Sequence, residues 1–172
     1  PLQKNIFSID AKGKKLCLTD AKGKNQAKFS EHFQYFVHDY ANANNPNVIS
    51  LKDSKGKAIR EIEKNENILP LYAQYQLNKK EFFKFSTPDN IELNGWMLKP
   101  KNFNQAQKYP VVMIQYSGPG SQLVLDEWNV GWEYALTEKG YLVVCVDGRG
   151  TGGRGADFMK QTYKNLGELE AK

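Results

Sequence analysis

The segment best suited to chemistry is a turn sequence, residues 116–122, that reads Tyr-Ser-Gly-Pro-Gly-Ser-Gln. It directly follows residues 111–116, which are rich in β-branched side chains and predict a strand that the glycines and proline then end. A side chain at the carboxyl end of an inner strand of an α/β sheet faces the crevice where ligands bind. The Tyr116 hydroxyl there would be a rigid neutral donor able to stabilise an oxyanion in acyl transfer. On the pattern alone, a rim tyrosine that packs and hydrogen-bonds locally is the favoured interpretation.

A second glycine-rich segment, residues 147–155, satisfies G-x-G-x-x-G between a predicted strand and a predicted helix. Glu170 follows about twenty residues later, the spacing of a dinucleotide fingerprint, but it comes after a helix and does not end a second strand. Asp147 also puts a negative charge at the loop entrance, where it would repel a phosphate. We therefore expect no cofactor. The expected role is structural, with Asp147 pairing with Arg149 or accepting backbone N–H groups.

A catalytic nucleophile is missing from the sequence. No serine lies in the G-x-S-x-G elbow that exposes a reactive hydroxyl, and Ser121 fails this pattern because Gln and Leu follow it. The two histidines, His32 and His38, flank an aromatic stretch in the other half of the chain, and packing or surface roles are expected for both. No Ser-His-Asp triad can be assembled. The spacings of zinc and calcium sites are also missing, so no metal site is expected.

The first part of the chain, residues 1–70, predicts short strands separated by turns. Alternating apolar and polar residues indicate strands at 5–9, 15–19, 33–38, 47–51 and 58–62. Three similar Asp-x-Lys-Gly-Lys turns begin at Asp10, Asp20 and Asp53. This rhythm is typical of a β-sandwich, a barrel or a propeller blade. A blade is stable only against its neighbours.

A connector, residues 71–80, precedes a segment with α/β rhythm, residues 81–172. Strands are expected at 81–86, 92–98, 111–116 and 142–146, and helices at 128–139 and 156–163. This order is the beginning of an α/β sheet. We expect it to end with an unpaired apolar edge at residues 142–146, which predicts low stability or self-association.

Composition excludes several function classes. The net charge of +5 comes from lysines in the first half of the chain, and these gather in the predicted turns, so we expect no nucleic-acid partner. The longest apolar run, residues 141–146, is too short to span a bilayer. Two cysteines do not form a disulfide framework, and Cys145 in the apolar run is expected to be buried.

Two motifs together resemble the prolyl oligopeptidase family, and within it the bacterial dipeptidyl peptidases. These are Tyr109-Pro110 before the strand with Y-S-G-P-G-S-Q after it, and V-D-G-R-G-T-G from residue 146. They occur in the family in the same order and at similar spacing. The resemblance implies a mixed fold, with the last blade of a β-propeller over residues 1–70. Residues 81–172 would then be the N-terminal half of an α/β-hydrolase domain, incomplete in this chain.

The resemblance also implies an activity. Such enzymes release N-terminal dipeptides with Pro or Ala second, through an acyl-enzyme on serine. Tyr116 matches the tyrosine whose hydroxyl forms half of the oxyanion hole. The serine, acid and histidine would follow Lys172, and the glutamates that hold the substrate amine would precede Pro1. Substrate-binding residues are therefore unassigned, and the chain by itself is expected to be inactive.

The remaining expectations concern the longer protein. The resemblance implies a peptide substrate, a homodimer and a periplasmic or cell-surface location. A non-catalytic binding module, or a catalytically dead relative, fits the same residues. An acylaminoacyl-peptidase-like relative is disfavoured because Tyr116 stands within Y-S-G-P where such a relative would have His.

Overall fold

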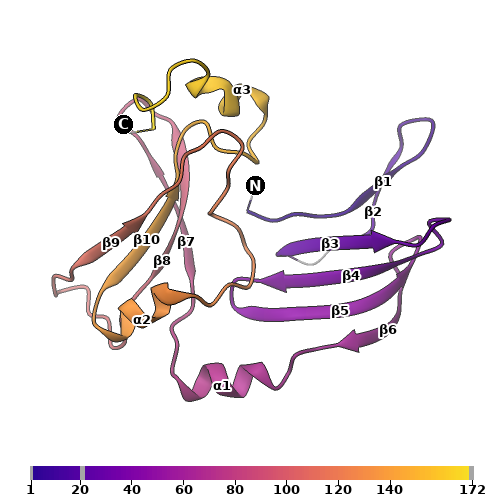
Figure 1. Ribbon diagram of the computed structural model, residues 1–172, viewed down its shortest axis with the longest axis horizontal. Helices are drawn as coiled ribbons and strands as arrows, with labels where there is room; N and C mark the ends of the chain where they lie inside the picture. The colour runs from indigo at the N-terminus through magenta and orange to yellow at the C-terminus, as the bar shows by residue number, and fades with distance from the viewer. Residues whose placement is uncertain (1, 20–21, 171–172) are drawn as a thin grey trace. The chain divides into compact units, whose positions relative to one another are not determined.

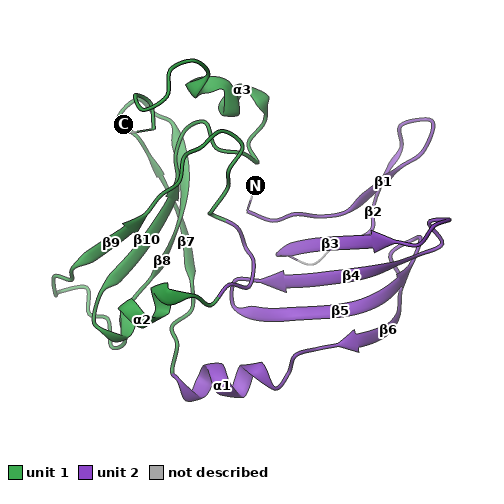
Figure 2. Ribbon diagram, viewed as in Figure 1, with its two compact units in different colours: residues 1, 76–124, 130–172 green, residues 2–75, 125–129 purple. Residues whose placement is uncertain are grey.

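The computed structural model describes residues 2–19 and 22–170, whose regular secondary structure is mostly β-sheet with few helices (Figure 1). The chain divides into two compact units (Figure 2). Unit 2 comprises described residues 2–75 and 125–129, and unit 1 comprises residues 76–124 and 130–170. Among the described residues, no helix has the length and apolar character needed to cross a membrane.

Unit 2 begins with a hairpin of β1 (Phe7–Ile9) and β2 (Lys15–Cys17). The turn between them is the first of the predicted lysine–glycine turns. Oδ1 of Asp10 accepts the backbone N–H groups of Lys12 and Lys14, each at 2.9 Å, and Gly13 has a φ of +82°. The turn at Asp53 repeats these bonds between β5 and β6. Both turns are therefore confirmed, whereas the turn at Asp20 begins outside the described residues.

The main sheet of unit 2 has four antiparallel strands in chain order. They are β3 (Lys24–Phe29), β4 (Tyr35–Asn42), β5 (Asn45–Asp53) and β6 (Ala58–Glu63). The strands predicted at 33–38, 47–51 and 58–62 correspond to β4, β5 and β6 with shifted ends. Strand β3 was not predicted, because its polar sequence lacks alternation; its pairing with β4 and the buried side chain of Asn25 hold it in the sheet.

A helix, α1 (Ile68–Gln74), overlaps the start of the predicted connector, residues 71–80. This helix was not predicted from the sequence, because a proline in a helix interior usually interrupts it. Here Pro70 lies in the first turn, where backbone N–H groups have no partner within the helix, so the proline removes no hydrogen bond.

Unit 2 also contains residues 125–129, which come from the second half of the chain. The carboxylate of Asp126 accepts the Ala43 N–H at 2.8 Å, and the Asp126 N–H donates to the carbonyl of Leu2 at 3.0 Å. Glu127 forms an ion pair with Lys24. Nothing in the sequence pattern indicated this return, which begins directly after residue 124 of unit 1.

Unit 1 is built on a four-stranded sheet with the order β7-β8-β10-β9. The strands are β7 (Glu81–Ser86), β8 (Glu92–Leu98), β9 (Val111–Ile114) and β10 (Leu142–Asp147). The prediction of an unpaired edge at 142–146 is wrong. Strand β10 is hydrogen-bonded to β8 on one side and, in parallel, to β9 on the other. The crossover from β9 thus places the largely buried strand β10 inside the sheet, and β9 lies at its edge.

The helices of unit 1 are shorter than predicted. Helix α2 (Trp132–Glu138) contacts β8 and β10 and ends before Gly140, whose φ is +84° (Figure 1). It starts later than residue 128 because residues 125–129 belong to unit 2. The predicted helix 156–163 is α3 (Ala156–Met159) followed by a short 3-10 helix, η1 (Lys160–Thr162).

Candidate functional site

Tyr116 lies two residues beyond the end of β9, at the carboxyl edge of the parallel pair formed with β10. Its side chain is 64% exposed, and its hydroxyl has no hydrogen-bond partner among the described residues. It borders a pocket of about 480 Å³. The pocket is lined by the residues around the tyrosine and by three from the last described turn: Gln115, Tyr116, Ser117, Gly118, Pro119, Leu166, Gly167 and Glu170. The hydroxyl is therefore available to a molecule bound there.

The residues after Tyr116 form a tight turn. The Ser121 N–H donates to the carbonyl of Gly118 at 3.0 Å, and the two central residues are Pro119 and Gly120, the latter with a φ of +77°. Proline first and a glycine of positive φ second are characteristic of a type II turn. The Ser121 hydroxyl lies 2.6 Å from the carbonyl oxygen of Gly118 and 3.0 Å from that of Tyr116, so it closes the turn onto the tyrosine backbone.

The glycine-rich loop after β10 is bonded to this turn. The Gly152 N–H donates to the carbonyl of Ser121 at 2.7 Å, and the Gly120 N–H donates to that of Gly150 at 3.4 Å. The buried carboxylate of Asp147 accepts the N–H groups of Leu123 and Val124 at 2.8 and 3.0 Å. Burial raises the pKa of this carboxyl, while the two backbone hydrogen bonds act to lower it. The prediction that Asp147 accepts backbone N–H groups is confirmed.

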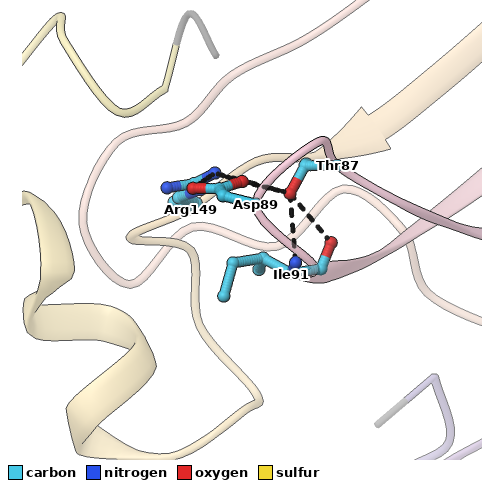
Figure 3. Close-up of polar contacts among 4 residues, drawn as sticks. All are labelled: Thr87, Asp89, Ile91 and Arg149. Atoms are coloured by element: carbon cyan, nitrogen blue, oxygen red, sulfur yellow. Dashed lines mark hydrogen bonds and ion pairs between the residues drawn. The ribbon is translucent and has the colours of Figure 1, made fainter.

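The alternative prediction, that Asp147 pairs with Arg149, is wrong. Nη2 of the buried Arg149 donates to both carboxylate oxygens of Asp89, at 2.5 and 2.6 Å (Figure 3). The Thr87 hydroxyl donates to Asp89 Oδ1 at 2.5 Å and accepts the Ile91 N–H at 3.1 Å. The bond from Arg149, followed by that from Thr87, lowers the pKa of Asp89 to about 2. The loop is thereby fixed to the turn between β7 and β8.

This Arg149–Asp89 pair had no signal in the sequence. The two residues lie 60 positions apart. Asp89 lies in a Pro-Asp-Asn segment, where an aspartate is expected as a turn residue and so gave no sign of a distant partner. Only the sheet order, which places β8 beside β10, brings the two segments together.

The other candidate residues have structural surroundings. His38 is buried in unit 2, and its Nε2 lies 2.8 Å from Asn25 Oδ1, whereas His32 is exposed. Burial raises the pKa of the Cys145 thiol to about 12, so it stays protonated and unreactive at neutral pH. Among residues 2–19 and 22–170, no group of His, Cys, Asp and Glu side chains could hold a metal ion.

Comparison with known proteins gives a consistent result. A model of the prolyl oligopeptidase family matches residues 128–172. The chain is 38% identical over 152 residues to dipeptidyl peptidase 4 of Trichophyton equinum, a match of 85% of this chain and 20% of that protein. It is 33% identical to a probable dipeptidyl-aminopeptidase B of Arthroderma otae, over 99% of this chain and 19% of that protein.

Two solved bacterial structures extend the likeness to the fold. The crystal structure of Porphyromonas gingivalis dipeptidyl peptidase 4 matches with a TM-score of 0.93 and 44% identity, over 98% of this chain and 24% of that chain. A putative dipeptidyl aminopeptidase IV from Bacteroides ovatus matches with a TM-score of 0.84 and 29% identity, over 96% of this chain and 24% of that chain. The chain thus spans about a fifth of the length of the curated relatives. The resemblance found in the two motifs is confirmed: this chain belongs to the prolyl oligopeptidase family.

Proposed function

We propose that this chain is part of a serine exopeptidase resembling dipeptidyl peptidase 4, in which Tyr116 stabilises the oxyanion. The parent enzyme would release dipeptides with Pro or Ala second from peptide N-termini. The observation that carries the proposal concerns the surroundings of the Tyr116 hydroxyl. This hydroxyl is exposed, has no partner among the described residues and borders a pocket at the carboxyl edge of two parallel strands.

Acyl transfer to a serine requires a hydrogen-bond donor of this kind. When a serine attacks a peptide carbonyl, the carbonyl oxygen becomes an oxyanion, and donors already in place lower the barrier because they need no reorganisation. A phenol hydroxyl donates without carrying a charge of its own. The turn bonded to the glycine-rich loop would hold the tyrosine backbone during this step. The serine, the acid and the histidine of the reaction are assigned to no residue of this chain.

The two units are proposed to belong to different domains of the parent enzyme. The four antiparallel strands of unit 2, joined in chain order, have the form of a propeller blade. The parallel pair within unit 1, with a helix between its strands, has the form of an α/β sheet. The proposed boundaries remain a propeller part over residues 1–70, a connector over 71–80 and the start of a hydrolase domain over 81–172. A homodimeric parent in the periplasm or at the cell surface is proposed from the family resemblance alone.

The test is a Tyr116→Phe substitution in the full-length protein that contains this chain. Phenylalanine keeps the ring and removes the donor, so kcat for a Gly-Pro or Ala-Pro chromogenic substrate should fall by about a hundredfold or more with little change in KM. Tyr75→Phe is the control, since Tyr75 is a similarly exposed tyrosine of unit 2. The 172-residue chain alone should give no turnover. An unchanged kcat in Tyr116→Phe, or turnover by the chain alone, would refute the proposal.

A further inference from the structure

The phenol ring of Tyr116 folds back over the turn that follows it. A Cβ atom added to Gly118 would lie 2.9 Å from both Cζ and Oη of Tyr116, closer than real Cβ atoms approach other heavy atoms. Any side chain at position 118 would therefore move the hydroxyl end of the tyrosine. The φ of Gly118 is outside the left-handed region, so its backbone does not require glycine. Glycine at position 118 is thus required by the space that the tyrosine hydroxyl occupies, and not by the backbone conformation.

Ser121 fixes the other side of the same turn. Its one hydroxyl proton faces the carbonyl oxygens of Gly118 and Tyr116, at 2.6 and 3.0 Å. Its own carbonyl accepts the Gly152 N–H at 2.7 Å. A side chain on Gly152 is excluded in turn, because its Cβ would lie 2.7 Å from the carbonyl oxygen of Gly120. The turn is therefore held between the tyrosine and the glycine-rich loop.

We infer that Gly118 and Ser121 are positioning residues for the Tyr116 hydroxyl. Gly118 provides the space in which the hydroxyl lies, and Ser121 ties the tyrosine backbone to the turn. This inference rests on the proposed function of Tyr116. The place of this one oxygen atom matters because a displacement of about 1 Å in a reacting geometry can cost a hundredfold in rate.

The decisive variant is Gly118→Ala in the full-length protein. The atoms that the new methyl group meets belong to the end of an exposed side chain, which can move away at little cost in stability. We expect kcat to fall by about tenfold to a hundredfold, with KM and the melting temperature nearly unchanged. Gly131→Ala is the control for a clash elsewhere in unit 1. Its Cβ would meet the carboxylate of the buried Glu133 at the start of α2, so the melting temperature should fall while kcat stays unchanged.

A double substitution separates positioning from a general structural role. In a Tyr116→Phe background there is no hydroxyl to displace, so Gly118→Ala should cause no further loss of kcat. Ser121→Ala should give a smaller loss that is likewise absent in the Tyr116→Phe background. Ser121→Thr restores a hydroxyl and should recover activity. If Gly118→Ala fails to fold, Ser121→Ala and Ser121→Thr still test the positioning role.

The outcomes distinguish this inference from the proposed function. Wild-type kcat in folded Gly118→Ala, or equal losses with and without the Tyr116 hydroxyl, overturns the positioning role and leaves the proposed function standing. With Gly118→Ala unfolded, a wild-type kcat in Ser121→Ala overturns it in the same way. An unchanged kcat in Tyr116→Phe overturns both.

Discussion

The two four-stranded sheets of this chain bury different kinds of residue. The main sheet of unit 2 buries the polar side chains of Asn25, His38 and Ser50 beside the apolar Phe36, and its strands follow one another in chain order. Unit 1 buries the apolar strand β10, in which Val143 and Cys145 are fully buried, and inserts it between strands that come earlier in the chain. The first sheet pairs strands that are neighbours in sequence, whereas the second also pairs segments that lie far apart in the chain.

The difference explains why the candidate site lies in unit 1. A parallel pair brings the carboxyl ends of two strands to one edge, so the residues after β9 and those after β10 meet there. The bonds that the Gly152 N–H donates to Ser121 and the Leu123 N–H donates to Asp147 are the result. Chain-order antiparallel strands instead return after each turn, so the carboxyl ends of neighbouring strands lie at opposite edges of the sheet.

The largest expected effect tests how far unit 2 depends on its apolar residues. Phe36 is 1% exposed and Phe33, on the preceding turn, is 67% exposed. We expect Phe36→Ala to lower the free energy of unfolding by about 3–5 kcal/mol, because it removes a buried ring and leaves a cavity. Phe33→Ala is the control and should change it by less than about 0.5 kcal/mol. Urea denaturation of the chain measures both. Equal effects of the two substitutions would mean that the buried ring of Phe36 stabilises this sheet no more than the exposed ring of Phe33.

A smaller effect tests the polar interior of unit 2. The Asn25 side chain donates to the carbonyl of Lys4 at 2.9 Å and accepts at 2.8 Å from the buried ring of His38 when Nε2 carries the proton. Asn25→Ala leaves these buried groups without their partner, so the expected loss is about 1–3 kcal/mol. The exposed Asn45 provides the control, and Asn45→Ala should cost less than about 0.5 kcal/mol. A neutral Asn25→Ala in the same urea measurement would show that water replaces these bonds.

The contrast between local and long-range contacts also decides which features the sequence could predict. Strands β7 and β8 were predicted residue for residue, since alternation and a Pro-Asp-Asn turn are local signals. Tyr116 was singled out because a strand and a turn adjoin it. Strand β3 was missed because its hydrogen bonds, not its pattern, hold it. The place of β10 inside the sheet, and the Arg149–Asp89 pair that follows from it, depend on contacts across many residues that no local pattern records.

The smallest expected effect concerns this long-range pair and its dependence on pH. Asp89→Asn keeps an oxygen that can accept from Arg149 and removes the charge, so we expect a modest fall in melting temperature at pH 7. The pKa of Asp89 is lowered in the folded chain from 3.8 to about 2, and so the unfolded chain binds more protons between these values. The stabilisation by Asp89 is therefore fully present above about pH 4 and is lost as the pH falls through about 2. The melting temperatures of the chain and of Asp89→Asn should differ by a constant amount down to about pH 4 and converge below it.

Glu92→Gln is the control: its partner Lys84 is exposed, whereas Arg149 is buried, so its effect at pH 7 should be smaller still. A difference that persists undiminished at pH 2, or that is absent at pH 7, would mean that Arg149 is fixed without the charge of Asp89.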